Sequence, residues 1–215
     1  MALYIPPSFA AKDRAAIAHL IHDYPFATLI TPAAPEPWVS HIPLLLTDAH
    51  EPHGTLIGHF ARANPHWQHT KGVHSVAVFH GPHAYVSPSW YTEPAQAVPT
   101  WNFTAIHAHG PLEIFDDAAA ARAVLDALIQ RFEATRPAPW TFAMSDRQRD
   151  ALIGSIVAFK LPIQRLDAKF KLSQNRIPED RIRVIAALKA EGYSEATETA
   201  GWMQAYAGVG DDHTS

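Results

Sequence analysis

The 215-residue chain contains no cysteine, which excludes disulfide bonds, thiolate nucleophiles and cysteine-ligated iron–sulfur clusters. It has no apolar run near the ~20 residues of a membrane helix, and its first residues lack a charged leader followed by an apolar stretch. These absences predict a cytoplasmic protein without membrane attachment. The formal net charge of −4 leaves no broad basic face, and no helix-turn-helix signature is present, which together argue against direct DNA binding.

Motifs of the common nucleotide-binding and hydrolytic folds are also missing. There is no Walker loop, no G-x-G-x-x-G turn and no G-x-S-x-G elbow, so an NTPase, a Rossmann dehydrogenase and an α/β-hydrolase lose support. Histidine is abundant instead, with 11 of 14 lying between His41 and His109. His107 and His109 would share one strand face, but zinc needs three or four ligands, so no metal site is predicted.

The middle of the chain alternates short β-like segments with turn residues, and its later part is mostly helical. The connections are too short for crossover helices, which predicts antiparallel strands closing into a barrel or sandwich. Strands are expected at 26–31, 38–47, 54–61, 73–80, 84–88, 100–115 and 155–172, with helices at 8–24, 118–134, 145–154 and 178–192. We therefore predict an α+β, mainly β fold with peripheral helices, as a single domain over 1–215 whose C-terminal helical segment begins at about 178.

The stretch GHFARANPHWQ (58–68) ends a predicted strand with an arginine and an asparagine. Arg62, Asn64 and free backbone N–H groups of a short helix could together bind one anion, because a guanidinium matches phosphate oxygens. The alternative is a surface arginine that caps a turn. A second polar stretch, FKLSQNR (170–176), offers Lys171 and Ser173 to an anion, or a residue that caps a turn.

Two further stretches favour a flat ligand. In VSHIPLLL (39–46) a proline interrupts the strand, which leaves a backbone edge free, although an ordinary edge strand explains the pattern equally. Residues 83–110 gather aromatic and polar side chains around a proline-rich loop. Such a mixture suits a planar heterocycle, and the alternative is a barrel core lined by aromatic residues.

Six motifs occur in a fixed order: YIPPSFA, VSHIPLLL, LIGHFARANPHW, AYVSPSWY, VPTWNFTAIHAHG and KLSQNR. In this set and order the sequence resembles the PaiB-like family, described as FMN-binding negative transcriptional regulators, over about residues 1–185. The resemblance implies an antiparallel split β-barrel of the FMN-binding type, a bound FMN, and a homodimer with the flavin at the subunit interface.

The resemblance also implies which residues bind FMN. The phosphate would lie near His59, Ala61, Arg62 and Asn64, with support from Lys171, Ser173, Gln174 and Asn175 of this subunit or its partner. The ring or ribityl chain would lie near Thr100, Trp101 and Asn102, and His41 would lie at the pyrimidine edge.

Three functions stay open on this basis. The first is a flavin-binding negative transcriptional regulator of the PaiB type. The second is an FMN-dependent oxidoreductase or flavin reductase that uses a nicotinamide donor. The third is a heme-binding or heme-degrading split-barrel protein, since the chain is rich in histidine. No catalytic residue is assigned from the sequence.

Overall fold

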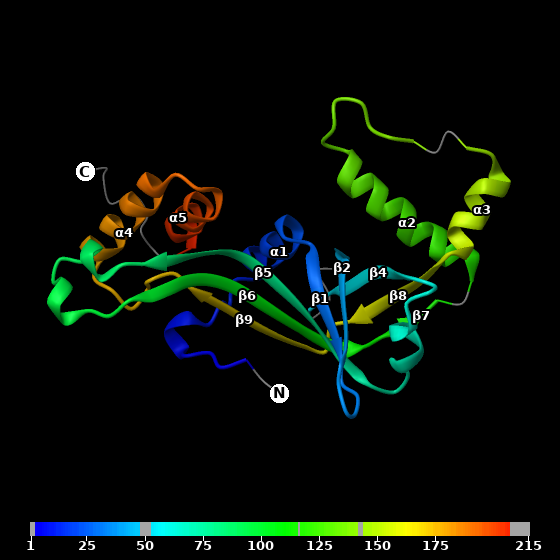
Figure 1. Ribbon diagram of the computed structural model, residues 1–215, viewed down its shortest axis with the longest axis horizontal. Helices are drawn as coiled ribbons and strands as arrows, with labels where there is room; N and C mark the ends of the chain where they lie inside the picture. Colours follow the sequence, from blue (N-terminus) through cyan, green and yellow to red (C-terminus); the bar gives the residue numbers. More distant parts are fainter. Residues whose placement is uncertain (1–2, 48–52, 116, 142–143, 207–215) are drawn as a thin grey trace. The chain divides into compact units, whose positions relative to one another are not determined.

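The computed structural model describes residues 3–47, 53–115, 117–141 and 144–206. Within them the strands form two sheets, of order β2-β1-β5-β6-β9 and β3-β4-β8-β7 (Figure 1). The strands are β1 (Phe26–Thr31), β2 (Trp38–Pro43), β3 (Leu45–Thr47), β4 (Thr55–Ala61), β5 (His74–Val86), β6 (Thr100–Pro111), β7 (Glu113–Ile114), β8 (Ile156–Pro162) and β9 (Arg165–Lys171). The antiparallel, mainly β prediction is confirmed, and the described pairings form two sheets rather than one closed barrel.

Five α-helices and four short 3₁₀ helices are described in addition. They are η1 (Pro7–Phe9), α1 (Arg14–Asp23), η2 (Pro65–His69), η3 (Pro88–Trp90), η4 (Pro94–Gln96), α2 (Ala118–Glu133), α3 (Asp146–Gly154), α4 (Pro178–Glu191) and α5 (Ser194–Tyr206). None of the helices in the described ranges is both long enough and apolar enough to cross a bilayer.

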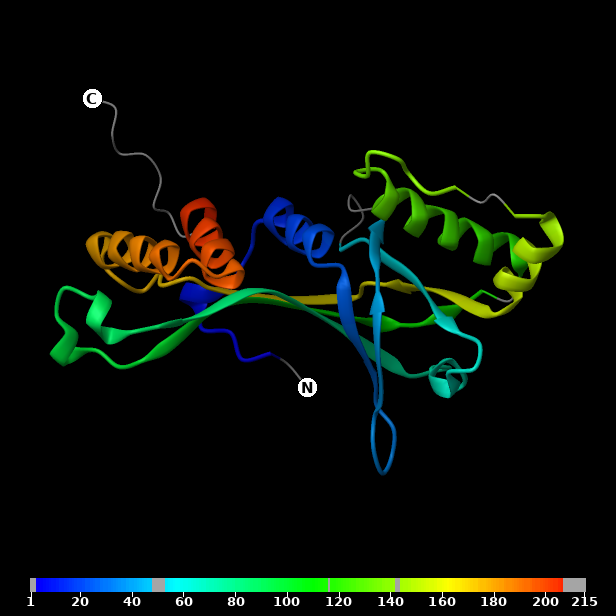
Figure 2. The ribbon, with the colours of Figure 1, turned by 45° about the horizontal axis from the view of Figure 1, so that its top comes forward.

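The chain divides into two compact units, residues 1–20, 80–106 and 167–215, and residues 21–79 and 107–166. In the first unit, α4 and α5 pack together on one side of the strands (Figure 2). The indole of Trp202 on α5 meets the ring of Phe170 on β9 edge-on at 5.4 Å. This side of β9 is therefore covered, because Phe170 is buried beneath the helix.

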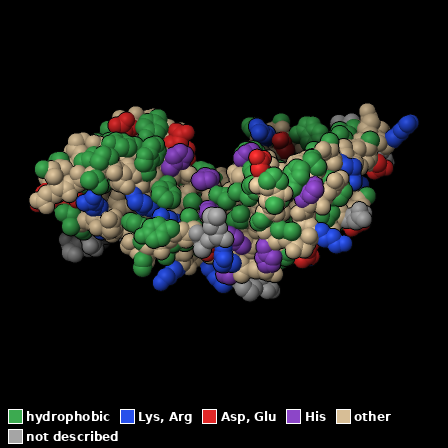
Figure 3. Space-filling model, turned by 60° about the horizontal axis from the view of Figure 1, so that its bottom comes forward, with side chains coloured by type: hydrophobic (Ala, Val, Ile, Leu, Met, Phe, Trp, Pro, Cys, Tyr) green, Lys and Arg blue, Asp and Glu red, His purple; other side chains and the backbone are tan. Residues whose placement is uncertain are grey.

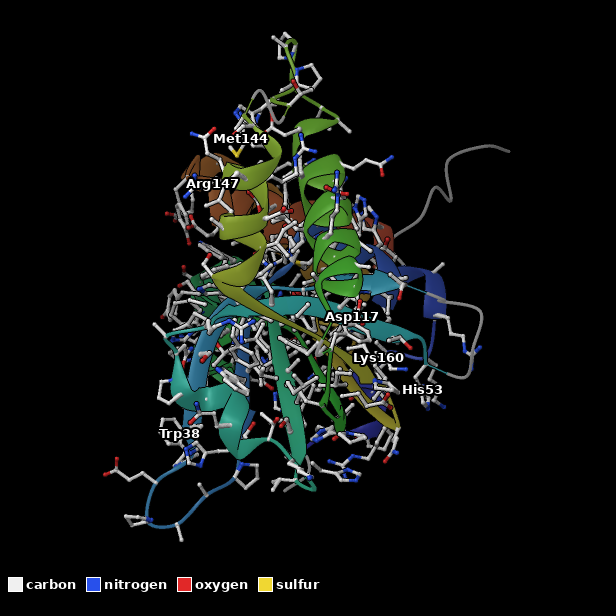
Figure 4. The ribbon with its side chains drawn as sticks, turned by 90° about the vertical axis from the view of Figure 1, so that its right-hand side faces the viewer. Trp38, His53, Asp117, Met144, Arg147 and Lys160 are labelled. Atoms are coloured by element: carbon white, nitrogen blue, oxygen red, sulfur yellow. The ribbon has the colours of Figure 1, made fainter. Side chains whose placement is uncertain are left out.

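In the second unit, α2 and α3 pack against β4 and β8 (Figure 4). Asp117 caps the first turn of α2 by accepting a hydrogen bond from Ala120 N at 2.7 Å. Ser145 and Gln148 form a reciprocal capping box at the start of α3. The buried cluster beneath the helices consists of Ala121, Val124, Leu128, Ile153 and Ala158. Burial of these apolar side chains anchors both helices to the sheet.

The structure corrects four strand predictions, one of which is segment 100–115, divided into β6 and β7 of different sheets. Segment 38–47 is divided into β2 and β3, because Pro43 cannot donate to a ladder and Leu44 N instead bonds Pro25 O at 2.9 Å. Segment 155–172 is likewise divided into β8 and β9, which belong to different sheets. The two strands expected at 73–80 and 84–88 are one strand, since β5 runs through Gly81-Pro82 without a break.

The helix predictions need two corrections. The N-terminal helix begins at Arg14 rather than Ser8, because Asp13 accepts the Ala15 N–H at 2.9 Å and so caps the helix. The helix α5 was not predicted, since its small and polar residues give no clear apolar period. Burial of Ala196, Ala200, Trp202 and Met203 is the tertiary contact that stabilises it.

We expect Gly81→Ala to lower the free energy of unfolding by about 1–3 kcal/mol, because overpacking a core strains it. A Cβ at Gly81 would lie 2.2 Å from Thr104 Oγ1 and 2.9 Å from Leu20 Cδ1. The matched control is Gly201→Ala on α5, where nothing lies within 4 Å of the new Cβ, and helix propensity predicts a gain of up to about 1 kcal/mol. Urea unfolding measures both, and equal effects of the two changes would contradict the packing argument.

Candidate functional site

The guanidinium of Arg62, just after β4, binds the end of helix α3. Its Nε donates to Gly154 O at 2.6 Å and its Nη2 donates to Ile156 O at 2.9 Å. Helix C-termini leave carbonyl groups without intrahelical partners, and these two bonds satisfy carbonyls at the α3–β8 junction. They use two of the five guanidinium N–H donors. Arg62 therefore has a structural role, and its contact with an anion stays a prediction.

Asn64 is the centre of a turn that leads into η2. Its Oδ1 accepts from His66 N at 3.0 Å, and its Nδ2 donates to Ser40 Oγ at 3.0 Å. The amide thus joins the turn to strand β2, and Trp38 at the start of that strand stacks on His69 with ring centroids 4.3 Å apart (Figure 4). Asn64 holds the strand end in place, whereas its predicted contact with a phosphate is an expectation that these bonds do not test.

His66 is fully buried at the centre of a polar chain. Its Nδ1 lies 2.8 Å from Ser40 Oγ and its Nε2 lies 2.8 Å from Thr31 Oγ1, which in turn lies 2.6 Å from Ser75 Oγ. Burial, and secondarily the charge of His69, lowers the pKa of His66 to about 4. The imidazole is therefore neutral near pH 7, with one ring nitrogen donating and the other accepting.

His41 and His59 occupy different environments in this unit. His41 is exposed on β2, with Nδ1 3.1 Å from Thr28 Oγ1, and it shares its strand face with exposed Val39. His59 lies opposite Ala158 of β8, and burial lowers the pKa of its imidazole. Its Nδ1 is buried without a hydrogen-bond partner among the described residues. Ala61, at the end of the same strand, is exposed.

Lys171 at the end of β9 is the cationic centre of the other unit. Its Nζ donates to Thr100 Oγ1 at 2.6 Å and to Trp101 O at 2.5 Å. Burial lowers the pKa of this ammonium, and the neighbouring charges of Lys169 and Arg176 lower it further. The ammonium is thus held beside the first residues of β6 in a partly desolvated position, where a charge interacts strongly with a ligand.

Three of the predicted cofactor residues shape the turn after β9, and their contact with the cofactor stays a prediction. The buried Asn102 donates from Nδ2 to Ser173 Oγ at 2.9 Å, and Ser173 has a left-handed φ of 65°. Gln174 Oε1 accepts from Leu172 N at 2.7 Å, and its Nε2 donates to Phe170 O at 2.6 Å. These side chains fix the backbone that carries Lys171. Asn175, another predicted cofactor residue of the stretch 170–176, is exposed.

An aromatic and cationic surface lies on the sheet face that includes Trp101. Trp101 is 53% exposed, and its ring lies 6.2 Å from Tyr85 and 6.0 Å from His83. The ammonium of Lys169 lies 5.2 Å from the centroid of the Phe103 ring and 5.3 Å from that of Tyr4. Figure 3 shows hydrophobic and Lys or Arg side chains next to each other on the face that it presents. We call the set Tyr4, His83, Tyr85, Trp101, Phe103, Lys169 and Lys171 the aromatic–cationic face.

The sequence analysis did not select His83, Lys169 or Tyr4 as site residues. The alternation of β9 was available as a signal, because Lys169 and Lys171 are two positions apart and must share a strand face. The predicted residues themselves fall into two groups. His41, His59, Ala61, Arg62 and Asn64 belong to the unit of residues 21–79 and 107–166, and Thr100 to Asn102 and Lys171 to Asn175 belong to the other.

Comparison with known proteins identifies relatives along most of the chain. The family model described as "Putative FMN-binding domain" matches residues 3–165. "Protease synthase and sporulation protein PAI 2" of Bacillus subtilis (strain 168) is 32% identical over 205 residues, which cover 94% of this chain and 97% of that protein.

Solved structures with the same fold include two flavin or heme proteins. The FAD and heme binding protein from Mycobacterium smegmatis has a TM-score of 0.58 at 18% identity, covering 75% of this chain and 72% of that chain. The flavocytochrome Anf3 from Azotobacter vinelandii has a TM-score of 0.57 at 14% identity, covering 75% and 69%. At these identities the likeness concerns the fold, which is of the split-barrel type.

Proposed function

The chain belongs to the FMN-binding family whose model matches residues 3–165, and from this membership we propose that it is an FMN-dependent regulator of the PaiB type. The observation that carries the assignment of the site is the aromatic–cationic face, where Trp101 is exposed beside the ammonium of Lys171. A flat ring and a phosphate are the two ends of FMN, joined by its ribityl chain, and this face offers a partner for each end.

The residues present fit the cofactor. Trp101 and Tyr85 present aromatic surface for the isoalloxazine, while Lys169 and Lys171 supply positive charge for the phosphate. When bound, FMN supplies one- and two-electron transfer, and the protein binds and orients it.

We also propose that FMN lies at the interface of a homodimer. Exposed apolar surface supports this, since Tyr4 is 80% exposed, Trp101 53% and Tyr85 41%, and patches of this kind mark interaction sites. Light scattering after gel filtration tests the proposal, with an expected mass of about twice the 23.7 kDa of one chain. A monomer that binds FMN fully would contradict the dimeric site.

Regulation through a metabolite or a partner protein is favoured over direct DNA contact. Helix α5 carries Glu195 and Glu198 and no lysine or arginine, so it lacks the charge of a helix that reads DNA. An FMN-dependent oxidoreductase is the second candidate, because the fold is shared with flavin proteins.

An anaerobic titration separates the two candidates. The purified chain should bind about one FMN per subunit, since each subunit has one set of the proposed FMN-binding residues. Failure to bind added FMN would remove the central proposal. Bleaching of the bound flavin by NADH or NADPH, followed in a stopped-flow spectrometer, would establish the oxidoreductase. An unbleached flavin would favour the regulator.

Arg62→Ala is expected to weaken FMN binding by about tenfold or more and riboflavin binding far less, because only FMN carries the phosphate. The variant should also lose about 1 kcal/mol of stability through the two carbonyl contacts at the α3–β8 junction. Fluorescence titration with each flavin measures the first effect and urea unfolding the second. The control is Arg122→Ala, an exposed helix pair with Asp126, where both changes should be small. Equal losses for FMN and riboflavin would show that Arg62 does not bind the phosphate.

A further inference from the structure

A cavity of about 290 Å³ lies on the helix-covered side of the first unit, and the Nζ of Lys171 lies 5.9 Å from the ring centroid of Phe9 in its lining. It is lined by the N-terminal segment 9–13 with Ala16, by Phe170 and Gln174, and by Ala205 and Tyr206 at the end of α5. This volume is near the lower end of the about 300–1,000 Å³ of small-molecule sites. It therefore suits a single small metabolite rather than a nucleotide or a peptide.

The inner wall of the cavity is aromatic and already ordered. Phe9 and Phe170 are 9% and 5% exposed, and the Tyr206 ring lies 6.1 Å from Phe170. Trp202 packs against Tyr206, with ring centroids 4.6 Å apart. A preformed apolar wall lowers the entropic cost of binding, because its side chains need no ordering.

The outer end of the cavity carries two opposite charges on consecutive residues, Lys12 and Asp13. Among the described residues, the Lys12 ammonium makes no hydrogen bond or ion pair, so it is available to an anion. Asp13 uses Oδ1 to accept the Ala15 N–H at 2.9 Å, and its second oxygen can accept from a ligand. Gln174, on the same lining, is held by Leu172 N and Phe170 O and presents a fixed amide.

We propose that this cavity binds an α-amino acid with an apolar or aromatic side chain. The ligand carboxylate pairs with Lys12, its ammonium pairs with Asp13, and its side chain packs against Phe9, Phe170 and Tyr206. A zwitterion can pair with both of these charges, whereas a ligand with one charge can pair with only one of them. The cavity adjoins the proposed flavin site through the contact of Phe9 with Lys171, but the inference does not depend on FMN binding.

Ligand binding in this cavity would restrain the turn after β9, because the cavity lies beside that turn. Phe170 and Gln174 lie one residue before and three residues after Lys171, so a ligand held against them restrains the turn that carries this lysine. The cavity is thus placed to act as a regulatory site, on the face of β9 opposite to the aromatic–cationic face.

Isothermal titration of the full chain with L-phenylalanine and two analogues tests the charge pattern. Phenethylamine lacks the carboxylate, and 3-phenylpropionate lacks the ammonium. We expect L-phenylalanine to bind and each analogue to bind about tenfold more weakly, since each loses one charge-assisted contact. Absence of binding up to about 10 mM L-phenylalanine, or equal binding of all three compounds, would overturn the proposal.

Variants assign each charge to its side chain. Lys12→Gln should weaken L-phenylalanine about tenfold and leave phenethylamine unchanged, because that analogue has no carboxylate. Asp13→Asn, which keeps the oxygen that caps α1, should weaken L-phenylalanine and leave 3-phenylpropionate unchanged. Lys71→Gln, an exposed lysine of the other unit, is the matched control and should bind like the parent chain. A loss in Lys71→Gln equal to that in Lys12→Gln would reject this cavity as the site.

Discussion

Acidification from pH 7.5 to pH 5 should lower the free energy of unfolding by about 2 kcal/mol through His66 alone. The pKa of this imidazole is lowered from 6.5 to about 4 in the folded chain, first by burial and then by His69. Protonation would give the imidazole a second N–H donor, so the Ser40 and Thr31 hydroxyls could both serve only as acceptors. It would also place a charge between two hydroxyl groups, since the ring nitrogens of His66 face Ser40 and Thr31 rather than a carboxylate.

The sign of this pH effect on stability follows from the difference in proton binding between the folded and unfolded chain. The unfolded chain binds a proton at His66 below about pH 6.5, whereas the folded chain binds it only near pH 4. The contribution of His66 to the free energy of unfolding is therefore fully present well above pH 6.5. It is lost as the pH falls toward 4. A shift of this size corresponds to about 3 kcal/mol in full, a large part of the 5–15 kcal/mol that stabilises a typical domain.

Urea unfolding at several pH values measures this loss, and two variants isolate it from the other histidines. His66→Gln removes the titrating group, so its stability should depend less on pH than that of the parent chain. His69→Gln removes an exposed imidazole and should keep most of the dependence. An NMR titration gives the pKa of His66 directly, and a value near 6.5 would refute the explanation.

Lys171→Met should weaken FMN binding by about 30-fold or more, which is the second large effect. A charge-assisted hydrogen bond contributes about 1.5–3 kcal/mol, and methionine keeps the length of the side chain without its charge. The ammonium also joins Thr100 and Trp101 to β9, so its loss loosens the start of β6 beside the exposed indole. Fluorescence titration with FMN and with riboflavin measures the change.

The comparison of the two flavins defines the role of Lys171. A loss confined to FMN would assign the ammonium to the phosphate, and equal losses would assign it to the ring or to the strand contact. Lys189→Met on α4 is the matched control, and it should leave both affinities unchanged, because Lys189 is exposed and has no proposed contact with the flavin. Unchanged FMN binding in Lys171→Met would remove Lys171 from the site.

Local signals in the sequence predicted the helices with clear caps and periods. Pro178 and Gly192 mark the two ends of α4, where Gly192 has the left-handed φ of 74° that ends a helix without strain. The capping box at Ser145 starts α3 as expected. Strand β1 matches its predicted range because an apolar alternation and flanking prolines define both ends.

The candidate site was predictable to a smaller extent, since partners distant in sequence decide what each polar side chain does. Arg62 was expected to bind an anion, yet its bonds reach Gly154 and Ile156, about 90 residues away in the sequence. Asn102 was expected near the flavin; the structure shows it fully buried against Ser173, and its contact with the flavin stays a prediction. No local pattern encodes such pairings, because each requires the strands to be in register first.

The sequence by itself determined the family, the antiparallel mainly β class and the cofactor, because motif order and apolar alternation survive without any tertiary contact. Only the tertiary structure decided that β5 passes through Gly81-Pro82, where close packing on Thr104 and Leu20 overrides a local turn preference. It also decided that the polar residues after β4 and β9 divide between structural bonds and exposed surface. Hydrogen bonds between segments far apart in the chain make that division, and their geometry exists only in the folded protein.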